Sequence, residues 1–470
     1  MATYLTSGND GYVADGGEIV HALEGNDQIY IIHVDDSSPL DIDFDYFAPA
    51  EVYGEQGDDY IVSYGFGDRL YGDSGNDTLI GGGGDDTQHG GSGNDKIYTG
   101  SSKSENSISE GDTVWAGTGD DTVYLQSASN GDTIRGEDGY DALYLYNSGG
   151  HISQFSLLAG GSNAGLLASG FEELHYSGGN GFEAVEGGNN ADHISGGGGT
   201  DIISGLGGHD SLLGGSGADI INGGTGDDAM WGGSEDDILN GDDGGDILLG
   251  EAGNDKLNDG KGNDAVAGGD GNDTIRTGMG NDSANGGNGN DIIREEGSDV
   301  SYYIFMGIKV PVIGGDSLYG GAGNDDIQGG TGDDDIDGGF HDDIVNGGSG
   351  IDELTGGGGN DRFQFSAVTD SGIGMARDAV TDFAVTAGKG FTFTDRIDVS
   401  AIDAIQSLGG SQNFSFIGTA GFSAEGQIRI RQQGDNTVVQ LNTSGTGGAE
   451  AAIILENLDS TTLTFVDFIL

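Results

Sequence analysis

The chain has 470 residues, of which 80 are acidic and 15 are basic, so its formal net charge is −65. It holds 98 glycines, three prolines and no cysteine. So strong a negative charge argues against nucleic acid or an anionic membrane as a partner, because both are themselves negatively charged. No apolar run reaches membrane-spanning length, so we expect no membrane insertion. Without cysteine, neither disulfides nor thiol chemistry contribute.

Residues 1–50 hold degenerate repeats and are expected to cap one end of a repetitive fold. Asp10 and Asp27 lie in Gly-Asn-Asp turns, and an acidic, aromatic segment follows them. A cap is needed because an open end would expose strand edges and core. The start of the chain has no basic n-region and no apolar h-region, so it does not resemble a Sec signal peptide.

Residues 51–144 contain a first run of nine-residue repeats with an aspartate at the sixth position. A polar loop, SSKSENSISE, interrupts this run. The aspartates are Asp59, Asp68, Asp77, Asp86, Asp95, Asp112, Asp121, Asp132 and Asp141. Residues 145–186 lack such turns, but the interval from Asp141 to Asp192 is close to three coil lengths. We expect metal-free coils there, with an insert or a short helix at HISQFSLLAGG as the alternative.

The central segment, residues 187–294, divides into twelve consecutive nine-residue units, each with a sixth-position aspartate. Units such as GGSGADIIN and GGDGNDTIR fit the pattern GGxGxDxUx, where U is a large apolar residue, which is typical of a calcium-binding parallel β-roll. The aspartates are Asp192, Asp201, Asp210, Asp219, Asp228, Asp237, Asp246, Asp255, Asp264, Asp273, Asp282 and Asp291.

One repeat unit contains what a calcium site requires. Its glycines allow a tight turn with positive φ, and they let backbone carbonyls approach a common centre. The aspartate adds a hard anionic oxygen, and Ca²⁺ accepts six to eight oxygens in flexible geometry, whereas Mg²⁺ requires a stricter octahedron. Zinc is disfavoured at these turns, because cysteine is absent and histidine is irregularly placed. We therefore expect Ca²⁺ between the turns of units i and i+2.

The eighth residue of each unit is expected to point inward from a short strand. All twelve are apolar: Ile194, Ile203, Leu212, Ile221, Met230, Leu239, Leu248, Leu257, Val266, Ile275, Ala284 and Ile293. Two units make one coil, so odd and even units build opposite sheets. The predicted fold is all-β, a parallel β-roll or β-helix solenoid. A disordered acidic linker would not keep this inward apolar position.

Residues 295–313 include VSYYIFMGIKVPVI, an apolar segment that we interpret as one more metal-free coil or as a projecting hairpin. Residues 314–364 resume the repeats as a third roll. Its aspartates are Asp316, Asp325, Asp334, Asp343, Asp352 and Asp361.

Residues 365–470 lose the glycine period and gain aromatic and β-branched residues, which predicts a β-sandwich-like module. The stretches NDRFQF, DAVTDF, DRIDVSAIDA, NFSFIGTAGFSAEGQIRIR and FVDFIL resemble the C-terminal domain of serralysin-type metalloproteases. Together with the nonapeptides, they make the chain similar to the repeats-in-toxin (RTX) family. The resemblance implies type I secretion, with the signal at Asp467, Phe468, Ile469 and Leu470. At QQGDNTVVQLNTSGTGGAEAAIILEN the likeness weakens, which puts a metal site there in doubt.

The net charge and the repeats together predict that folding and calcium binding are one equilibrium. If each run of n repeats holds about n−2 ions, the chain binds on the order of 20 Ca²⁺, whose roughly +40 offsets most of the charge. Without the ions, the glycine content and the repulsion between like charges should keep the chain expanded.

No catalytic motif accompanies the repeats. The chain has no HExxHxxGxxH zinc motif, no GxSxG nucleophile elbow and no P-loop. Its eight histidines include no pair with zinc-motif spacing, and we expect His193 and His209 to be solvated surface residues. We therefore expect that the protein is not an enzyme.

Outward strand positions of the central segment carry apolar residues that stack on neighbouring coils. Contiguous exposed apolar area of this kind usually marks an interface. The candidates are Leu213, Trp231, Ile247 and Leu249 on one sheet and Ile202, Ile220 and Ile238 on the other. The alternative is that they are ordinary β-formers under a loop or insert.

These features favour a structural protein that is secreted, folds on Ca²⁺ outside the cell and self-assembles as an oligomer or polymer. The assembly would be a surface layer, a filament or an extracellular matrix, and export would need the type I secretion machinery. One alternative is a calcium-dependent adhesin or a module that binds cell-surface polysaccharide, although the few basic residues are scattered. Another is an enzyme with its site in residues 1–50 or 145–186.

Overall fold

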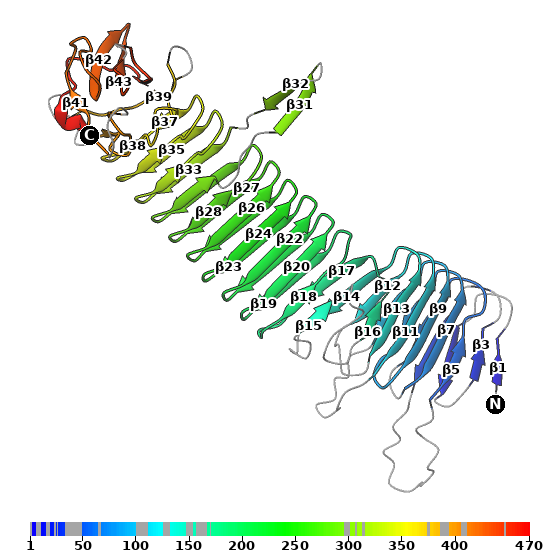
Figure 1. Cartoon of the computed structure of the whole chain (residues 1–470). Helices are drawn as coiled ribbons and strands as arrows, with labels where there is room; N and C mark the ends of the chain where they lie inside the picture. Colours follow the sequence, from blue (N-terminus) through cyan, green and yellow to red (C-terminus); the bar gives the residue numbers. More distant parts are fainter. Residues whose placement is uncertain are drawn as a thin grey trace. The chain divides into compact units, whose positions relative to one another are not determined.

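The computed structural model describes most of the chain, in two compact units, Met1–Ala229 and Met230–Leu470. The described residues are 2–5, 11–15, 19–22, 25, 27–32, 49–63, 67–99, 111–125, 132–146, 154–156, 167–169, 171–295, 301–305, 308–312, 315–373, 377–385, 394–405, 411–445 and 448–470. Short strands dominate both units (Figure 1). Among the described residues, helical structure is limited to one 3₁₀ turn, η1 (Phe465–Asp467), and no helix is long and apolar enough to cross a membrane.

The first unit is built from parallel strands that pair from one coil to the next. Sheet I contains β1 (Ala2–Tyr4), β3 (Ile19–His21), β5 (Glu51–Tyr53), β7 (Arg69–Ser74), β9 (Thr87–Ser92), β11 (Thr113–Thr118), β13 (Thr133–Asp138) and β16 (Leu167–Ser169). Sheet II contains β2 (Gly11–Asp15), β4 (Gln28–Ile32), β6 (Tyr60–Val62), β8 (Thr78–Ile80), β10 (Lys96–Thr99), β12 (Thr122–Leu125), β14 (Ala142–Tyr146), β17 (Glu173–Ser177), β19 (His193–Gly198) and β21 (Ser211–Ser216). Sheet III contains β15 (Gln154–Ser156), β18 (Ala184–Glu186), β20 (Ile202–Gly207) and β22 (Ile220–Thr225).

The register of these strands follows the period of the sequence. In sheet III, Ile203 lies beside Ile221, eighteen residues later, so two nine-residue units form one coil. Alternate residues of a strand face opposite sides, which turns the eighth residue of each unit inward. All twelve predicted inward residues of the central segment are buried, with at most 4% of their surface exposed. The predicted all-β parallel solenoid is therefore confirmed.

The described parts of residues 145–186 are strands of the same sheets. β17 pairs in parallel with β14, β16 with β13, and β18 with β15. Within HISQFSLLAGG, the described residues Gln154–Ser156 are strand, and the remainder lies outside the described residues. The segment between residues 33 and 48, with its acidic and aromatic side chains, also lies outside them.

The second unit continues the same construction. It begins within β23 (Ala229–Ser234). Sheet IV contains β24 (Ile238–Asp243), β26 (Lys256–Lys261), β28 (Thr274–Thr277), β30 (Ile292–Glu295), β34 (Asp326–Gln328), β36 (Ile344–Asn346), β38 (Arg362–Gln364), β40 (Arg396–Asp398) and β45 (Phe468–Ile469). Sheet V contains β25 (Ile247–Ala252), β27 (Ala265–Asp270), β29 (Ser283–Asn288), β33 (Ser317–Ala322), β35 (Asp335–Phe340), β37 (Glu353–Thr355), β39 (Ala379–Val380), β44 (Ala451–Leu455), β43 (Asn436–Asn442), β42 (Gln427–Gln433) and β41 (Ser415–Phe416).

The apolar segment after the central repeats is a hairpin and not an additional coil. β31 (Ser301–Phe305) and β32 (Ile308–Val312) pair with each other in an antiparallel, two-stranded sheet (Figure 1). Among the described strands, neither pairs with a strand of the roll sheets. β29 pairs directly with β33, so the parallel strand pairing of the roll continues across the insertion. Of the two alternatives for VSYYIFMGIKVPVI, the structure therefore selects the hairpin.

Strands from residues 365–470 extend both sheets of the roll. β40 pairs with β38 and β45 with β40, while β39 pairs with β37 and β44 with β39. β42, β43 and β44 form the small antiparallel part of sheet V. Within the described strands of the roll sheets, antiparallel pairing is therefore found only after the repeats end.

The insertion that holds the hairpin should be dispensable for the roll. The backbone step from Asp282 to Asp316 is 34 residues, whereas the neighbouring step from Asp264 to Asp282 is 18. Deleting residues 298–313 restores the 18-residue step, and we expect the deleted protein to keep its calcium-induced circular dichroism spectrum. Deleting the turn from Gly268 to Asp273, as a control, should reduce the calcium-induced spectrum more than the first deletion does, because it removes a ladder aspartate together with its glycine turn. Loss of structure in the first variant would show that the hairpin is needed for the fold.

Candidate metal centre

All 27 predicted metal-binding aspartates lie at buried positions. Each exposes between 0% and 5% of its surface. They follow the tight turns, where glycines adopt backbone angles that other residues rarely reach; in the unit that holds Asp273, Gly269 has φ 113° and Gly271 has φ 143°. The turns therefore place acidic groups inside the roll and not on its surface.

One oxygen of most of these aspartates accepts a hydrogen bond from the preceding coil. The Asp255 N–H donates to Asp273 Oδ1 at 2.8 Å, and the Asp273 N–H donates to Asp291 Oδ1 at 2.8 Å. The same bond recurs along both edges of the roll, for example from Asp192 to Asp210. These bonds align successive aspartates in two ladders that run along the coils.

The other oxygen of many of these carboxylates is buried without a hydrogen-bond donor. Within the described residues, this holds for Oδ2 of Asp59, Asp77, Asp95, Asp121, Asp141, Asp201, Asp210, Asp255, Asp273, Asp291, Asp325, Asp343, Asp352 and Asp361. An anionic oxygen buried without a partner is strongly unfavourable unless a cation compensates it. The recurrence of this feature at turn after turn indicates a site built for a cation.

The space beside these oxygens is shaped by glycine. A Cβ atom on Gly268 would collide with Asp273 Oδ2 and with the carbonyl oxygen of Gly286 on the next coil. Glycine thus leaves a carboxylate oxygen and a carbonyl oxygen facing a common space. Oxygen ligands of these two kinds fit Ca²⁺, so the residues present fit the ion that the sequence predicts.

Burial also disfavours the ionised form of these carboxylates when no cation is near. Desolvation raises the pKa of Asp273 to about 7 and that of Asp343 to about 8, and neighbouring carboxylates add to both shifts. Backbone N–H donors act in the opposite direction but do not cancel the desolvation. A divalent cation between the turns would favour the ionised form and remove the repulsion between neighbouring aspartates.

The structure adds acidic residues that the nonapeptide pattern missed. The Asp352 N–H donates to Asp378 Oδ1, and the Asp361 N–H donates to Asp395 Oδ1, so both ladders continue past the last predicted aspartate. In the first unit, Glu183 is 1% exposed and its N–H donates to Asp201, which places it in the ladder. The Asp27 N–H donates to Asp59 Oδ1, which places Asp27 in a ladder as well. The sequence signal that could have identified these residues is an acidic residue two positions before a buried apolar one, as in Asp378, Ala379 and Val380.

Asp259 is a further acidic residue, at the first position of its unit, where most central units have glycine. It is fully buried, and its Oδ2 has no hydrogen-bond partner. Its carboxylate, together with those of Asp264 and Asp282, offers oxygens that all lie within 4.8 Å of one another. This turn can therefore supply one more carboxylate to a cation than its neighbours can.

The predicted interface residues lie on outer strand positions with different exposures. Ile202, Leu213 and Ile247 are 41%, 40% and 46% exposed. Ile220, Trp231, Ile238 and Leu249 are half-buried. In sheet III, Ile202 lies beside Ile220, which makes one outward apolar pair of neighbouring coils.

The residues of the predicted secretion signal are part of the folded C-terminal segment. Asp467 and Phe468 are buried, whereas Ile469 and Leu470 are half-buried. Asp467 Oδ2 accepts from the Thr464 N–H at 2.6 Å, and Phe468 pairs with Ile397 in sheet IV.

Comparison with known proteins identifies the repeats. The model of the RTX calcium-binding nonapeptide repeat matches residues 62–97, 177–212, 204–239, 213–248, 240–275, 258–293, 312–340 and 337–370. The chain is therefore a β-roll protein with calcium-binding RTX repeats. Comparison with curated proteins gave no match.

Three solved structures are similar to parts of this chain. The AlgE6R3 subunit of a mannuronan C5-epimerase from Azotobacter vinelandii is 24% identical, with 33% of this chain and 72% of that chain covered and a TM-score of 0.19. The AlgE6R2 subunit of the same epimerase is 26% identical, with 32% and 79% covered and a TM-score of 0.19. The extracellular lipase LipA from Serratia marcescens is 18% identical, with 56% and 45% covered and a TM-score of 0.18.

Removing one ladder carboxylate should weaken calcium-dependent folding. We expect Asp273→Asn to raise the Ca²⁺ concentration at the midpoint of the circular dichroism transition, because the buried Oδ2 loses its charge. Asp270→Asn changes the charge equally at an exposed position, where Asp270 accepts from Asn288 Nδ2. This control should leave the midpoint unchanged. Equal shifts in the two variants would mean that only the net charge matters.

Proposed function

We propose that this chain is a secreted structural protein that folds when Ca²⁺ fills the ladders and then assembles with further copies of itself. The assembled form would be a surface layer, a filament or an extracellular matrix. The observation that carries the proposal is the burial of anionic oxygens at turn after turn, because it makes the folded state conditional on a cation that is abundant outside cells and scarce inside.

Export in an expanded state fits this chemistry. A chain with a formal net charge of −65 stays extended while calcium is scarce and becomes rigid after it leaves the cell. The C-terminal residues Asp467 to Leu470 would serve as the type I signal before they fold. Because Asp467 and Phe468 are buried in the folded chain, recognition by the secretion machinery would have to precede calcium-driven folding.

Outward apolar side chains support self-association. Ile247 is 46% exposed on β25, and Leu249 projects from the same face two residues later. Ala265 and Ala267 lie beside them on β27, so the apolar surface extends over two neighbouring strands. Apolar area that continues across strands is typical of an interface and is more than scattered exposed residues provide.

The proposal is tested by the association state of the calcium-loaded protein. We expect negative-stain microscopy and light scattering at high protein concentration to show ordered assemblies, and Trp231→Asp to reduce them while the circular dichroism spectrum stays native. Asn285→Asp is the matched control, because it adds the same charge at the ninth position of another unit, on an exposed residue of β29. Dispersed monomers in the wild type, or equal loss of assembly in both variants, would contradict the proposal.

A further inference from the structure

A column of five stacked rings runs across the outer face of sheet II. Its members lie at one position on five successive strands: Tyr98, Tyr124, Tyr144, His175 and His193. Successive ring centroids are 4.5, 4.8, 4.0 and 4.7 Å apart. The column ends in two imidazoles, because the next residue in the register is Ser211. Two metal-ligating side chains therefore lie side by side on the surface.

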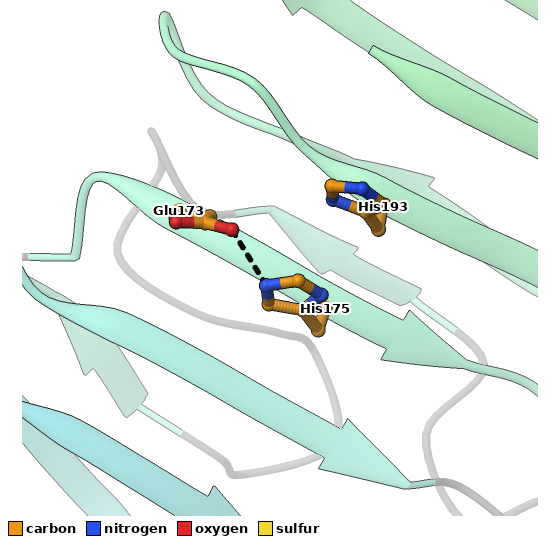
Figure 2. A group of neighbouring side chains, drawn as sticks. All are labelled: Glu173, His175 and His193. Atoms are coloured by element: carbon orange, nitrogen blue, oxygen red, sulfur yellow. Dashed lines mark hydrogen bonds and ion pairs between the residues drawn. The ribbon is translucent and has the colours of Figure 1, made fainter.

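A carboxylate completes this end of the column. Glu173 precedes His175 by two residues on β17, so both side chains project from the same face of the strand. Glu173 Oε1 lies 2.6 Å from His175 Nε2. Figure 2 shows the pair on one strand and His193 on the neighbouring strand. The three side chains offer ligand atoms that all lie within 4.8 Å of one another.

The cluster is open to solvent and separate from the calcium ladder. The Glu173 and His175 side chains are 26% and 22% exposed, and His193 is exposed. Asp192 precedes His193, yet its carboxylate is fully buried and accepts from the Leu174 N–H. A shallow pocket of about 320 Å³ adjoins the two imidazoles and is also lined by Tyr144, Tyr146, Ser195, Ser211 and Leu213.

We propose that Glu173, His175 and His193 bind a divalent transition-metal ion of the zinc class. Two imidazole nitrogens and one carboxylate oxygen suit Zn²⁺, Co²⁺, Ni²⁺ and Cu²⁺, whereas Ca²⁺ prefers oxygen ligands alone. Three protein ligands leave further coordination positions open, as in zinc sites that accept an exogenous ligand. Those positions face solvent and the pocket. The site thus differs in chemistry and in location from the calcium turns.

Metal binding replaces contacts that hold the cluster when no ion is bound. The ion takes the place of the hydrogen bond between Glu173 and His175, and the exposed ring of His193 turns out of the stack to direct a nitrogen toward it. An ordinary ion pair is the competing explanation for the cluster. The chain offers an internal comparison for this explanation in His21, which lies 3.0 Å from Glu55 and stacks between Tyr4 and Tyr53. Among the described residues, no second imidazole lies directly beside His21 in its stack.

The test is calorimetric titration of Zn²⁺ into the full-length protein held in saturating Ca²⁺. We expect one histidine-dependent site per chain, and we expect His193→Gln and Glu173→Gln to weaken it at least about ten-fold. His21→Gln is the matched control and should bind as the wild type does. Co²⁺ in place of Zn²⁺ should give visible absorption bands of a low-coordinate site, and these should be lost in His193→Gln.

Circular dichroism in Ca²⁺ verifies that each variant is folded. His193→Gln is the decisive variant, because His193 is exposed and its replacement should not disturb the fold. Zn²⁺ affinity that is equal in the wild type and in His193→Gln would overturn the proposal. So would a loss of affinity in His21→Gln as large as that in His193→Gln, or the absence of any histidine-dependent Zn²⁺ binding. Binding that disappears with His193 and Glu173 while His21→Gln is unaffected would establish the site.

Discussion

The structure depends on one constraint, which is that buried carboxylate oxygens at the turns need a cation. The inward side chains cannot hold the roll alone, since a nine-residue unit buries one inward side chain, in some units only Ala284 or the polar Gln88. Each unit also orders several glycines, whose loss of backbone freedom is the largest of any residue. Hydrogen bonds between coils align the aspartates but leave the second oxygen of many of them, such as Asp255 and Asp343, without a donor. Calcium supplies the missing interaction and offsets the charge at the same time.

This constraint explains why the roll tolerates insertions so well. Each coil contacts mainly the coils before and after it. An insertion that starts and ends at the same edge of the roll therefore leaves the hydrogen bonds between the flanking coils intact. The step from Asp86 to Asp112 is 26 residues and the step from Asp282 to Asp316 is 34, yet the N–H···Oδ1 bonds across both are 2.9 and 3.0 Å long. Insertions such as the hairpin of β31 and β32 can therefore vary without changing the metal-binding turns.

Much of the fold follows from the sequence because the period and the chemistry agree. Leu239 and Ile275 were predicted to point inward and are fully buried, since a strict eighth-position apolar residue has no other place in a two-sheet coil. Asp378 and Asp395 were missed because their turns lack most of the glycines that define the nonapeptide. Glu183 follows the full set of glycines, Gly178, Gly179 and Gly181, and was missed because glutamate stands where the pattern has aspartate. The choice between coil and hairpin for the segment after residue 295 could not be made, because a short apolar run fits either one.

The histidine cluster was beyond sequence reasoning for a different reason. His175 and His193 are eighteen residues apart, which matches one coil, but they lie in a region where the aspartate register is interrupted and the coil lengths differ. The pairing of β17 with β19, which places His175 directly beside His193, is seen only in the structure. His193 was expected to be a solvated surface residue, and it is exposed as expected. Its neighbours Glu173 and His175 are the residues with which it forms the proposed metal site.

The central claim is that calcium binding and folding are one equilibrium, and circular dichroism of the full-length protein tests it most directly. The spectrum of β-structure should be lost when a chelator removes Ca²⁺, should return when Ca²⁺ is restored to roughly millimolar concentration, and should not return with Mg²⁺ at the same concentration. A spectrum that is unchanged by chelation would contradict the claim, because the buried carboxylates would then be stable in the fold without a cation.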